Sequence, residues 1–420
     1  MVLTIGSMTM KDFARKCMFG VLVSLVMCSA AVAWEVTTLH EFAGGGNDGR
    51  SPWGGLTIDA STLYGMTYGG GDSDAGTIFS IGTDGNGFAL LHEFAGAPDD
   101  GKYPYGSLTL SGSTLYGMTS VGGDSNMGTI FSLGTGGGNI TLLHEFAGGG
   151  SDGELPFGNL TLDGSILYGM TCQGGDDDYG TIFSVGTDGN DFTILHEFAG
   201  GGSDGRDPRG SLTLVGSTLY GMTTRGGDSG YGTVFSIGTD GNDFTLLHEF
   251  AGGNTDGRTP NADLTLDGST LYGMTVYGGD SSAGTVFSIG TDGNDFTLLH
   301  EFAGGDSDGD GPLGSLTLDG STLYGMTTWG GDSDTGVLFS ISTDGTLFEI
   351  QHEFGGGAGD GSSPRYGPLT QGGSLPLYGM TREGGANGVG VIFIATPEPG
   401  AVVLLALGAA GLAAYRRKRK

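Results

Sequence analysis

The residues of this chain that could do acid–base or metal chemistry recur at a fixed spacing. The triplet His-Glu-Phe returns every 52 residues, at His40, His92, His144, His196, His248, His300 and His352. A neighbouring His and Glu can transfer protons or bind a metal ion. Seven equivalent catalytic pairs have no mechanistic logic, because an active site needs one constellation of groups. We therefore expect polar pairs on an outer strand, bonded within their own repeat or to the next one.

A second set of candidate ligands consists of aspartates in glycine-rich loops. The loop after His-Glu-Phe contains Asp48, Asp100, Asp152, Asp204, Asp256, Asp308 and Asp360. The motif Gly-Gly-Asp contributes Asp72, Asp124, Asp176, Asp228, Asp280 and Asp332. Oxygen-rich, flexible loops suit Ca²⁺, which accepts about 6 to 8 oxygen ligands. Asp-Gly and Gly-Asp pairs also form tight turns without a metal, and the pattern favours this simpler interpretation.

Residues 306–311 come nearest to a calcium loop. Asp306, Asp308 and Asp310 match the first half of an EF-hand loop, but Thr317 stands where a bidentate glutamate is required. These three aspartates are the candidate metal ligands. Ca²⁺ is the one cofactor that the sequence suggests.

Positions that differ between otherwise similar copies are better candidates for recognition. The residue before Gly-Gly is in turn Gly69, Val121, Gln173, Arg225, Tyr277, Trp329 and Glu383. The residue after the loop proline is in turn Trp53, Tyr105, Phe157, Arg209, Asn261, Leu313 and Arg365. If strands alternate up and down, both series open on one face. Exposed Trp and Tyr beside polar groups bind sugar rings, whereas free variation of exposed loops is the alternative. The candidate ligand-binding residues are Trp53, Tyr105, Phe157, Arg209, Arg225, Tyr277 and Trp329.

A repeated all-β scaffold must position these residues. The triplet Tyr-Gly-Met returns at Tyr64, Tyr116, Tyr168, Tyr220, Tyr272, Tyr324 and Tyr378, and the last copy departs from the spacing by two residues near Ser374. The chain has 90 Gly among 420 residues and no helical periodicity, which favours many turns over long helices. A period near 50 residues with several short strands per unit indicates a β-propeller rather than a helical solenoid.

Each repeat predicts four strands, which make one propeller blade. In the second copy the strands are expected over residues 107–110, 114–119, 128–133 and 140–146. The chain starts with a lone fourth strand over residues 35–42, and the seventh copy ends after its third strand, at residues 390–395. The N-terminal strand can complete the last blade and cover both open edges. Residues 34–395 are therefore predicted to form a closed seven-bladed β-propeller of 52-residue repeats.

Residues 1–33 have the pattern of a secretory signal peptide. Three basic residues precede an apolar run over residues 17–32, which closes on the small residues Ala31 and Ala33 of a cleavage site. A lipoprotein signal at Cys28 is the weaker alternative, because a methionine stands where a small residue is expected before it.

Residues 396–420 form a second targeting segment. Pro397, Glu398 and Pro399 lead into an uncharged run over residues 401–415 and a basic C-terminus. This order resembles the PEP-CTERM sorting signal. The resemblance implies an exosortase, a membrane-embedded sorting protease, as a partner that removes the tail. An ordinary tail anchor is the alternative, although the run is shorter than the roughly 20 residues of a typical spanning helix. The basic end should stay cytoplasmic.

Charge and cysteine content restrict the partners further. The chain has 47 Asp and Glu against 16 Lys and Arg. Nucleic acid is excluded as a partner, because binding to phosphates needs clustered Lys and Arg. Divalent cations, or neutral and cationic surfaces, fit this balance better. Cys172 is the one cysteine outside the signal peptide, so no intramolecular disulfide is expected.

The repeat itself resembles a known family. Leu-Tyr-Gly-Met-Thr, then Gly-Gly-Asp, then Gly-Thr-Ile-Phe-Ser, over residues 167–184, is similar to the GloVer tandem repeat of bacterial surface proteins with various anchors. The resemblance spans residues 34–395 and is distantly kelch-like. The seventh copy departs from it at Ala386, where the others have Asp. The family implies an architecture and a cell-surface address, and it brings no known reaction or ligand.

Three functions fit these observations. We favour a non-catalytic exported protein, located in the cell envelope or outside the cell and anchored at least transiently to the membrane by its tail. Its propeller would bind extracellular polysaccharide or another surface component. A secreted hydrolase or lyase acting on glycans is the first alternative, but it needs a catalytic constellation present once, and most carboxylates here recur with the repeat. A purely structural coat protein is the second alternative.

Overall fold

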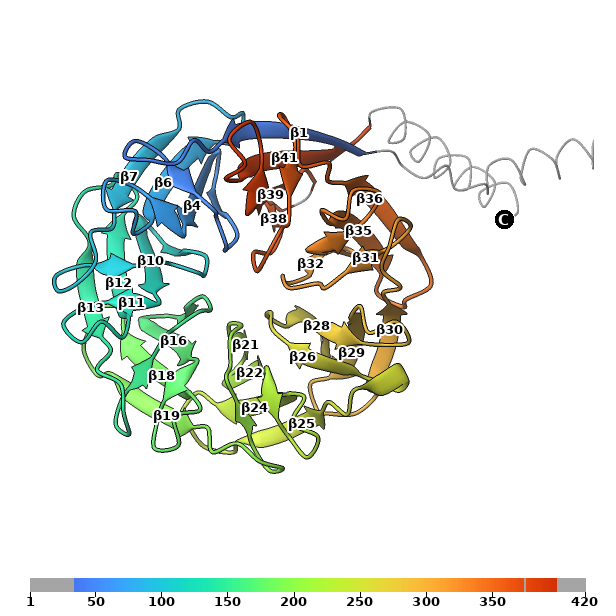
Figure 1. Ribbon diagram of the computed structural model, residues 1–420. Coiled ribbons are helices and arrows are strands. Elements are labelled where there is room, and N and C mark those ends of the chain that lie inside the picture. The colour runs from blue at the N-terminus through green and yellow to red at the C-terminus, as the bar shows by residue number, and fades with distance from the viewer. Residues whose placement is uncertain (1–33, 374, 399–420) are drawn as a thin grey trace, which may run out of the picture. The chain divides into compact units, whose positions relative to one another are not determined.

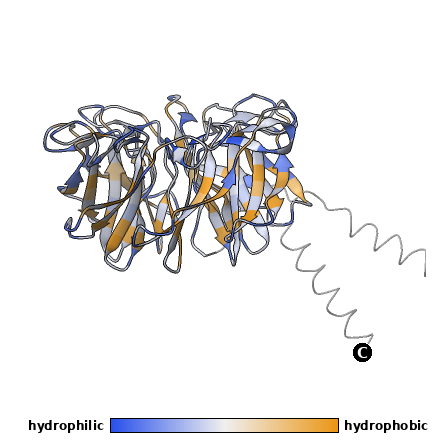
Figure 2. Cartoon of the chain, turned by 90° about the horizontal axis from the view of Figure 1, so that it is seen from below, coloured by the Kyte–Doolittle hydropathy of each residue, from blue (hydrophilic) through white to orange (hydrophobic). Residues whose placement is uncertain are grey.

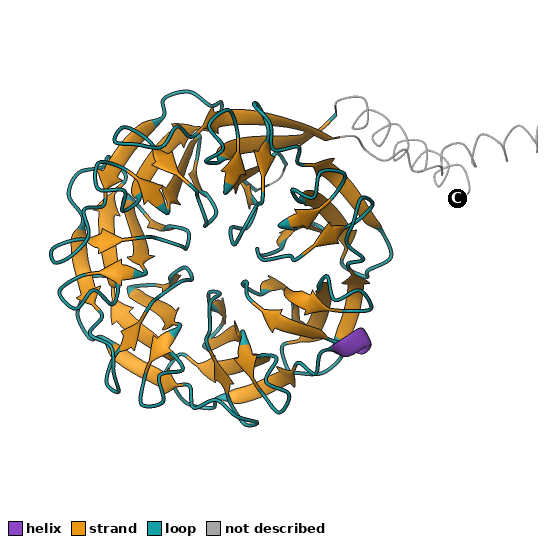
Figure 3. Ribbon diagram, in the orientation of Figure 1, coloured by secondary structure: helices purple, strands orange, loops and turns teal. Residues whose placement is uncertain are grey.

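Short runs of Thr, Leu, Ile and Phe between glycine-rich turns form strands throughout the repeat region, because these side chains suit a pleated surface. The structure, a computed structural model, describes residues 34–373 and 375–398. Seven antiparallel sheets stand around a central axis, as the view down this axis shows (Figure 1); six have four strands, and the fifth along the chain has one additional short strand. Among the described residues the helical structure consists of one 3₁₀ turn, η1 (Gly253–Thr255) (Figure 3). The predicted seven-bladed propeller is confirmed.

The strands of each blade follow one another from the axis to the rim, so that the innermost strand is the first of each repeat. Blade 1 contains β3 (Thr57–Asp59), β4 (Thr62–Thr67), β6 (Thr77–Gly82) and β7 (Ala89–Glu93). Blade 2 contains β9 (Thr109–Ser111), β10 (Thr114–Thr119), β12 (Thr129–Gly134) and β13 (Thr141–Glu145). Blade 3 contains β15 (Thr161–Asp163), β16 (Ile166–Thr171), β18 (Thr181–Gly186) and β19 (Thr193–Glu197). Blade 4 contains β21 (Thr213–Val215), β22 (Thr218–Thr223), β24 (Thr233–Gly238) and β25 (Thr245–Glu249).

The remaining three blades repeat this arrangement. Blade 5 contains β27 (Thr265–Asp267), β28 (Thr270–Gly278), β29 (Thr285–Gly290) and β30 (Thr297–Glu301). Blade 6 contains β32 (Thr317–Asp319), β33 (Thr322–Met326), β35 (Val337–Ser342) and β36 (Phe348–Glu353). Blade 7 contains β38 (Thr370–Gln371), β39 (Leu377–Thr381), β41 (Val391–Pro397) and, from the other end of the chain, β1 (Trp34–Glu41).

The ring closes through β1, as the sequence predicts. This strand is the outer strand of blade 7, next to β41. Inner strands are also joined from blade to blade, because one threonine hydroxyl in each donates to a leucine carbonyl of the next blade at 2.5–2.6 Å. The seven donors are Thr57, Thr109, Thr161, Thr213, Thr265, Thr317 and Thr370. Thr370 donates to Leu56 of blade 1, so the hydrogen-bonded circle is complete.

The core lies between neighbouring blades. In six of the interfaces the Tyr and Met of Tyr-Gly-Met from one blade pack on Leu and Phe side chains of the next, for example Tyr116 and Met118 against Leu167 and Phe183. The methionine is therefore core filling. Strands are apolar and the loops at both ends are hydrophilic (Figure 2). The interface between blades 7 and 1 has the same composition, and Phe42, which directly follows β1, is part of it.

Small two-stranded ladders join the loops at one end of the propeller. The loop that enters a blade pairs there with the loop between the second and third strands of that blade. The ladders are β2 (Gly49–Arg50) with β5 (Gly69–Gly70), β8 (Gly101–Lys102) with β11 (Val121–Gly122), β14 (Gly153–Glu154) with β17 (Gln173–Gly174), β20 (Gly205–Arg206) with β23 (Arg225–Gly226), β31 (Gly309–Asp310) with β34 (Trp329–Gly330), and β37 (Gly361–Ser362) with β40 (Glu383–Gly384). In blade 5, β26 (Gly257–Pro260) pairs with β28 in the same way. We call this end of the propeller the ladder face.

The targeting segments fall largely outside the described residues. Ala31, Ala33 and Pro399 lie outside them, as do the apolar run over residues 401–415 and the basic C-terminus. Pro397 is the last residue of β41, and Glu398 follows it. Among the described residues no helix is long and apolar enough to cross a membrane.

Candidate functional site

The loops of the ladder face turn inward at a strained residue just before the loop proline. This residue has a positive φ in every repeat, for example 59° at Tyr103 and 55° at Asp207. Such values are uncommon outside glycine and persist only where surrounding contacts hold them. Here the backbone N–H of the strained residue donates to a loop of the preceding blade, as Tyr103 does to Ala75 at 2.8 Å. The next residues then reach the axis.

A glycine after the axial residue lets the loops meet closely around the axis. A Cβ atom on Gly54, Gly106 or Gly158 would collide with backbone of the neighbouring blade. Glycine is thus required by close approach of two backbones. The consequence is a narrow central channel in which side chains from several blades touch one another.

Four of the predicted binding residues form a continuous cluster at this channel. The Trp53 and Tyr105 rings lie 5.0 Å apart, the Tyr105 and Phe157 rings lie 4.5 Å apart, and the Arg209 guanidinium lies 5.3 Å from the Phe157 ring centroid. Tyr366 stacks on Trp53 at 5.2 Å with an interplanar angle of 15°. We call these five residues the channel cluster. Its aromatic pairs have the offset or edge-to-face geometry that stabilises such contacts.

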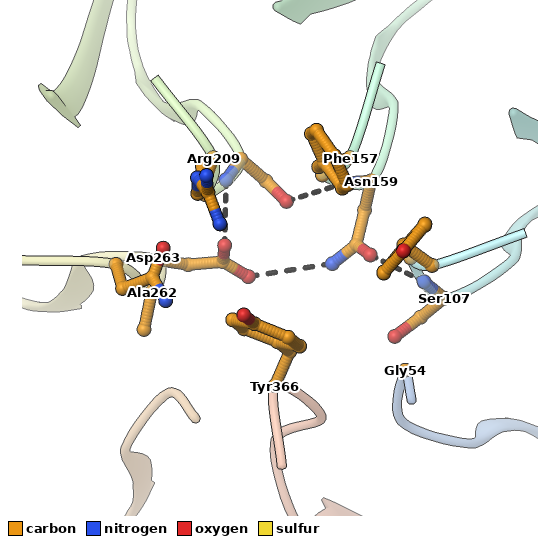
Figure 4. Close-up of a pocket in the computed structure, with 14 residues that line it drawn as sticks. Gly54, Ser107, Phe157, Asn159, Arg209, Ala262, Asp263 and Tyr366 are labelled. Atoms are coloured by element: carbon orange, nitrogen blue, oxygen red, sulfur yellow. Dashed lines mark hydrogen bonds between the residues drawn. The ribbon is translucent and has the colours of Figure 1, made fainter. Parts of the chain in front are cut away.

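A small cavity of about 20 Å³ lies within the channel, which is room for about one water molecule. Its wall combines channel-cluster residues with polar side chains that occur once (Figure 4). Asp263 accepts a hydrogen bond from the Ser211 backbone N–H at 2.6 Å and from the Asn159 amide at 3.3 Å. Asn159 in turn accepts from the Ser107 backbone N–H. The cavity wall is therefore a connected polar network from four blades.

Burial shifts two ionisable side chains of this wall, Asp263 and Tyr105, towards their neutral forms, and it does the same for Cys172, which lies beside Arg209 outside the wall. Burial raises the pKa of Asp263, against the opposing effect of hydrogen bonds from Ser211 and Ser315. Burial also raises the pKa of Tyr105 and, above all other causes, raises the pKa of the Cys172 thiol to about 11. A thiol with this pKa stays protonated at neutral pH and is a poor nucleophile.

Several buried polar atoms around the channel have no hydrogen-bond partner among the described residues. Asn261, which is 7% exposed, leaves its Oδ1 unpaired in the cavity wall. Trp53 Nε1, Arg365 Nε and Arg382 Nε are unpaired near the channel cluster, and Gln371 Oε1 is unpaired on β38. An unpaired buried polar atom costs about 1–3 kcal/mol, so such atoms mark places where a ligand or water can bind.

The other predicted binding residues lie in the ladders and are only partly connected to the channel. Trp329 contacts Arg365, whose guanidinium lies 5.9 Å from the indole ring. Tyr277 contacts Arg258 at 5.1 Å, and Arg225 forms an ion pair with Asp207 at 3.3 Å. The structure thus connects Trp329 to the channel cluster through Arg365, whereas Tyr277 and Arg225 have partners outside it.

The candidate metal ligands are not assembled by the structure. Asp308 accepts hydrogen bonds from His300 and from the backbone N–H groups of Ala303 at 2.9 Å and Gly309 at 2.7 Å, while Asp306 is exposed. Asp310 belongs to β31, where burial and then the Asp334 carboxylate raise its pKa. Within residues 34–373 and 375–398, no three His, Cys, Asp or Glu side chains are grouped as a metal site requires. The resemblance of residues 306–311 to a calcium loop is therefore limited to the sequence pattern.

The His-Glu pairs serve the turns of the ladder face. In every repeat His Nε2 lies 3.1–3.3 Å from the aspartate of the following loop. The glutamate accepts a backbone N–H from the Gly-Gly loop of the same blade, as Glu301 does from Asp280 at 2.9 Å. In blade 7, Glu41 of β1 performs this role for Ala386 at 2.7 Å. Both side chains are thus committed to structural hydrogen bonds.

Sequence reasoning missed three residues of the site. Tyr366 is an extra residue in the seventh copy. The threonine that donates to the next blade and the leucine that accepts are 51 residues apart in the earlier copies, but Thr317 and its partner leucine are 52 residues apart. The two additional residues of the last copy are therefore not both near Ser374, and counting from the loop proline would have revealed this. Asp263 and Arg382 are each the one charged residue at their position among the seven copies, and the same count would have singled them out.

Comparisons with solved structures show the fold. An oligogalacturonate lyase in complex with manganese is 14% identical, with a TM-score of 0.52 over 88% of this chain and 98% of that chain. A putative 6-phosphogluconolactonase from Bacteroides uniformis is 16% identical, with a TM-score of 0.48 over 74% and 86% of the two chains. TolB from Acinetobacter baumannii is 16% identical, with a TM-score of 0.39 over 65% and 58%. No curated protein matches the chain.

Comparisons with family models bear on both the repeat region and the tail. The model described as the Gloeobacter/Verrucomicrobia repeat matches residues 19–230 and 150–328. The model of the PEP-CTERM protein-sorting motif matches residues 395–420. Both resemblances seen in the sequence are confirmed. The chain belongs to the Gloeobacter/Verrucomicrobia repeat family and carries a PEP-CTERM sorting motif at its C-terminus.

Proposed function

We propose that this protein is a non-catalytic surface protein whose propeller binds extracellular polysaccharide at the channel cluster. The observation that carries the proposal is the position of the residues that break the repeat. Seven copies offer seven equivalent environments, yet Trp53, Tyr105, Phe157, Arg209 and Tyr366 differ in type and meet at one place. A site made from such residues can recognise one ligand, which a symmetric ring of identical groups cannot.

The chemistry of the cluster suits a sugar. Aromatic faces contact the CH groups of a pyranose ring, and nearby N–H and C=O groups bind its hydroxyls. The exposed Arg209 guanidinium supplies N–H groups of this kind beside the Phe157 ring. The ladder face is open to solvent at the channel mouth, where the Arg209 side chain is exposed. A polysaccharide could therefore lie across the mouth without entering the channel.

Two features favour binding over catalysis. Asp263 lines a cavity of about 20 Å³, which is far too small for a sugar ring. The Cys172 thiol, with its pKa raised to about 11, is not activated as a nucleophile. The catalytic alternative predicts that a bound oligosaccharide is shortened or changed in mass during incubation, which mass spectrometry would detect.

A glycan array tests this function. The exported protein should bind a defined subset of extracellular glycans, and replacing Trp53 and Tyr105 together with Ala should weaken binding by about tenfold or more, equivalent to about 1.4 kcal/mol. Tyr231→Ala is the matched control, because Tyr231 is 38% exposed on the ladder face and its ring faces Arg258 instead. Binding that survives the double substitution would place the ligand elsewhere. Failure to bind any glycan would favour the structural coat protein.

The address of the protein follows from its sorting motif, and we propose that an exosortase recognises it. Replacing Pro397, Glu398 and Pro399 with Ala should leave export intact but trap an uncleaved, membrane-bound form, because the apolar segment still inserts while the recognition site is lost. Mass spectrometry and membrane fractionation in a host with an exosortase provide the readout. Equal mass and equal membrane fraction for wild type and variant would identify a plain anchor.

A further inference from the structure

The basic residues of the propeller are gathered on one face. The chain is strongly acidic, but all eight Lys and Arg residues between the targeting segments lie in loops of the ladder face: Arg50, Lys102, Arg206, Arg209, Arg225, Arg258, Arg365 and Arg382. At the opposite end the described turns carry aspartates, such as Asp188 and Asp240, and no Lys or Arg. The same face also carries the loop aspartates and the glutamates of His-Glu-Phe, so its positive charge is confined to these individual side chains.

Two of these arginines pack on Trp53 of the channel cluster. The guanidinium of Arg365 lies 5.2 Å from the centroid of the Trp53 ring, and that of Arg382 lies 5.1 Å from it. Arg382 forms an ion pair with Glu383 at 2.6 Å. Arg365 forms no ion pair with any described residue, and burial, followed by the nearby Arg382 charge, lowers its pKa. The pair of arginines thus has one carboxylate to balance two positive charges.

The unpaired atoms of these residues are all hydrogen-bond donors. Trp53 Nε1, Arg365 Nε and Arg382 Nε are buried N–H groups without an acceptor among the described residues. None of the three can accept a hydrogen bond. The two guanidinium groups lie over one indole ring, so together they present several N–H donors to an anion with two acceptor oxygens. A guanidinium recognises such groups in a bidentate manner.

We propose that the Trp53–Arg365–Arg382 cluster binds the carboxylate of an acidic sugar, so that the ligand of this propeller is a polysaccharide containing uronic acid. This inference rests on the proposed function and adds the chemical class of the ligand. One uncompensated positive charge matches a singly charged anion, which favours a carboxylate over a doubly charged phosphate monoester. The sugar ring would contact the half-buried Trp53 and Tyr105 side chains where they reach the surface, and its carboxylate would contact the two guanidinium groups.

Matched oligosaccharides test the inference in titration calorimetry with the full exported chain. The probes are an oligosaccharide of a hexuronic acid, the same oligosaccharide after its carboxyl groups are reduced to alcohols, and an oligosaccharide without carboxyl groups that carries sulfate esters instead. We expect the uronic acid form to bind at least about tenfold more tightly than the reduced form, because hydrogen bonds between a guanidinium and a carboxylate are stronger than those to a neutral hydroxyl. The preference should weaken as salt concentration rises.

Substitutions locate the effect. Arg365→Gln should reduce the preference for the uronic acid form over the reduced form to about onefold. Arg258→Gln is the control, since Arg258 lies on the same face but contacts Tyr277 and Tyr231. Equal binding of the charged and reduced forms would overturn the inference and leave the proposed function intact. Tighter binding of the sulfated probe would overturn the assignment to a carboxylate. If the protein binds neither the probes nor any other glycan, both proposals are overturned.

Discussion

Deleting residues 34–44 should destabilise the propeller far more than the length of the segment suggests. The deletion removes β1, the outer strand of blade 7, together with Phe42 from the core between blades 7 and 1. It also removes Glu41, which accepts the backbone N–H groups of Ala386 and Gly359 at 2.7 Å. Loss of a buried Phe alone costs about 3–5 kcal/mol, and the freed edge of β41 can pair with other chains. We expect a lower melting temperature, a broader transition and aggregation.

Differential scanning calorimetry and light scattering measure these effects. The control is a permuted chain in which residues 34–44 follow residue 398 through a flexible linker, because it restores the outer strand from the other end. The permuted chain should recover most of the lost melting temperature. A deletion variant that melts like the wild type and stays monomeric would show that β1 is not needed to close the ring.

Asp308→Ala should cost several kcal/mol of unfolding free energy. The Asp308 carboxylate is 7% exposed and accepts hydrogen bonds from two backbone N–H groups and from His300. Removing it leaves both N–H groups unpaired, at about 1–3 kcal/mol each. Asp306→Ala is the matched control in the same loop, because Asp306 is exposed. It should change the unfolding free energy by less than about 0.5 kcal/mol.

The effect of Asp308→Ala should depend on pH. Burial would raise the pKa of Asp308, but the hydrogen bonds from His300, Ala303 and Gly309 outweigh it and lower the pKa. A carboxyl group whose pKa is lower in the folded state stabilises the fold above its unfolded pKa, near 4, and loses this contribution as the pH falls through the folded value. Chemical denaturation should therefore show the two proteins converging below about pH 4. A constant difference down to pH 2, or an equal loss in Asp306→Ala, would contradict the assignment. Stability that rises with added Ca²⁺ would restore the calcium interpretation of this loop.

The blades could be predicted because the residues of each strand and of the turns beside it lie close together in the sequence. Residues 114–119 were expected as a strand and form β10 (Thr114–Thr119), and the other three strands of that repeat shift by one or two residues. Alternating apolar residues and Asp-Gly turns determine these boundaries, and Gly189 has the required positive φ of 83°. The ladders could not be predicted. They consist of two residues per strand and depend on how loops from different parts of a repeat meet.

The candidate site was only half visible in the sequence. Variation between copies identified Trp53, Tyr105, Phe157 and Arg209, because equivalent positions of a repeat can be compared without any knowledge of the structure. Convergence at the axis could not be inferred from the sequence, since it depends on a strained residue before each loop proline and on glycines that let neighbouring loops touch. The same limit explains why Tyr277 and Arg225 were placed with the others. The repeat position that these two residues occupy varies between copies as strongly as the position of Trp53. In the structure, however, both residues belong to the ladders and have partners outside the channel cluster.

The tryptophans of this protein allow the most direct test of a ligand site at the channel. The chain has three, Trp34, Trp53 and Trp329, and the last two contact Arg365. In a Trp34→Phe variant, all tryptophan fluorescence therefore comes from the proposed site. Titration with the tightest glycan from the array should give a saturable change in emission, with the same dissociation constant as calorimetry, and Trp53→Phe in this background should reduce both the change and the affinity. Glycan binding by calorimetry with unchanged emission, and with unchanged affinity in the Trp53→Phe variant, would contradict a site at the channel.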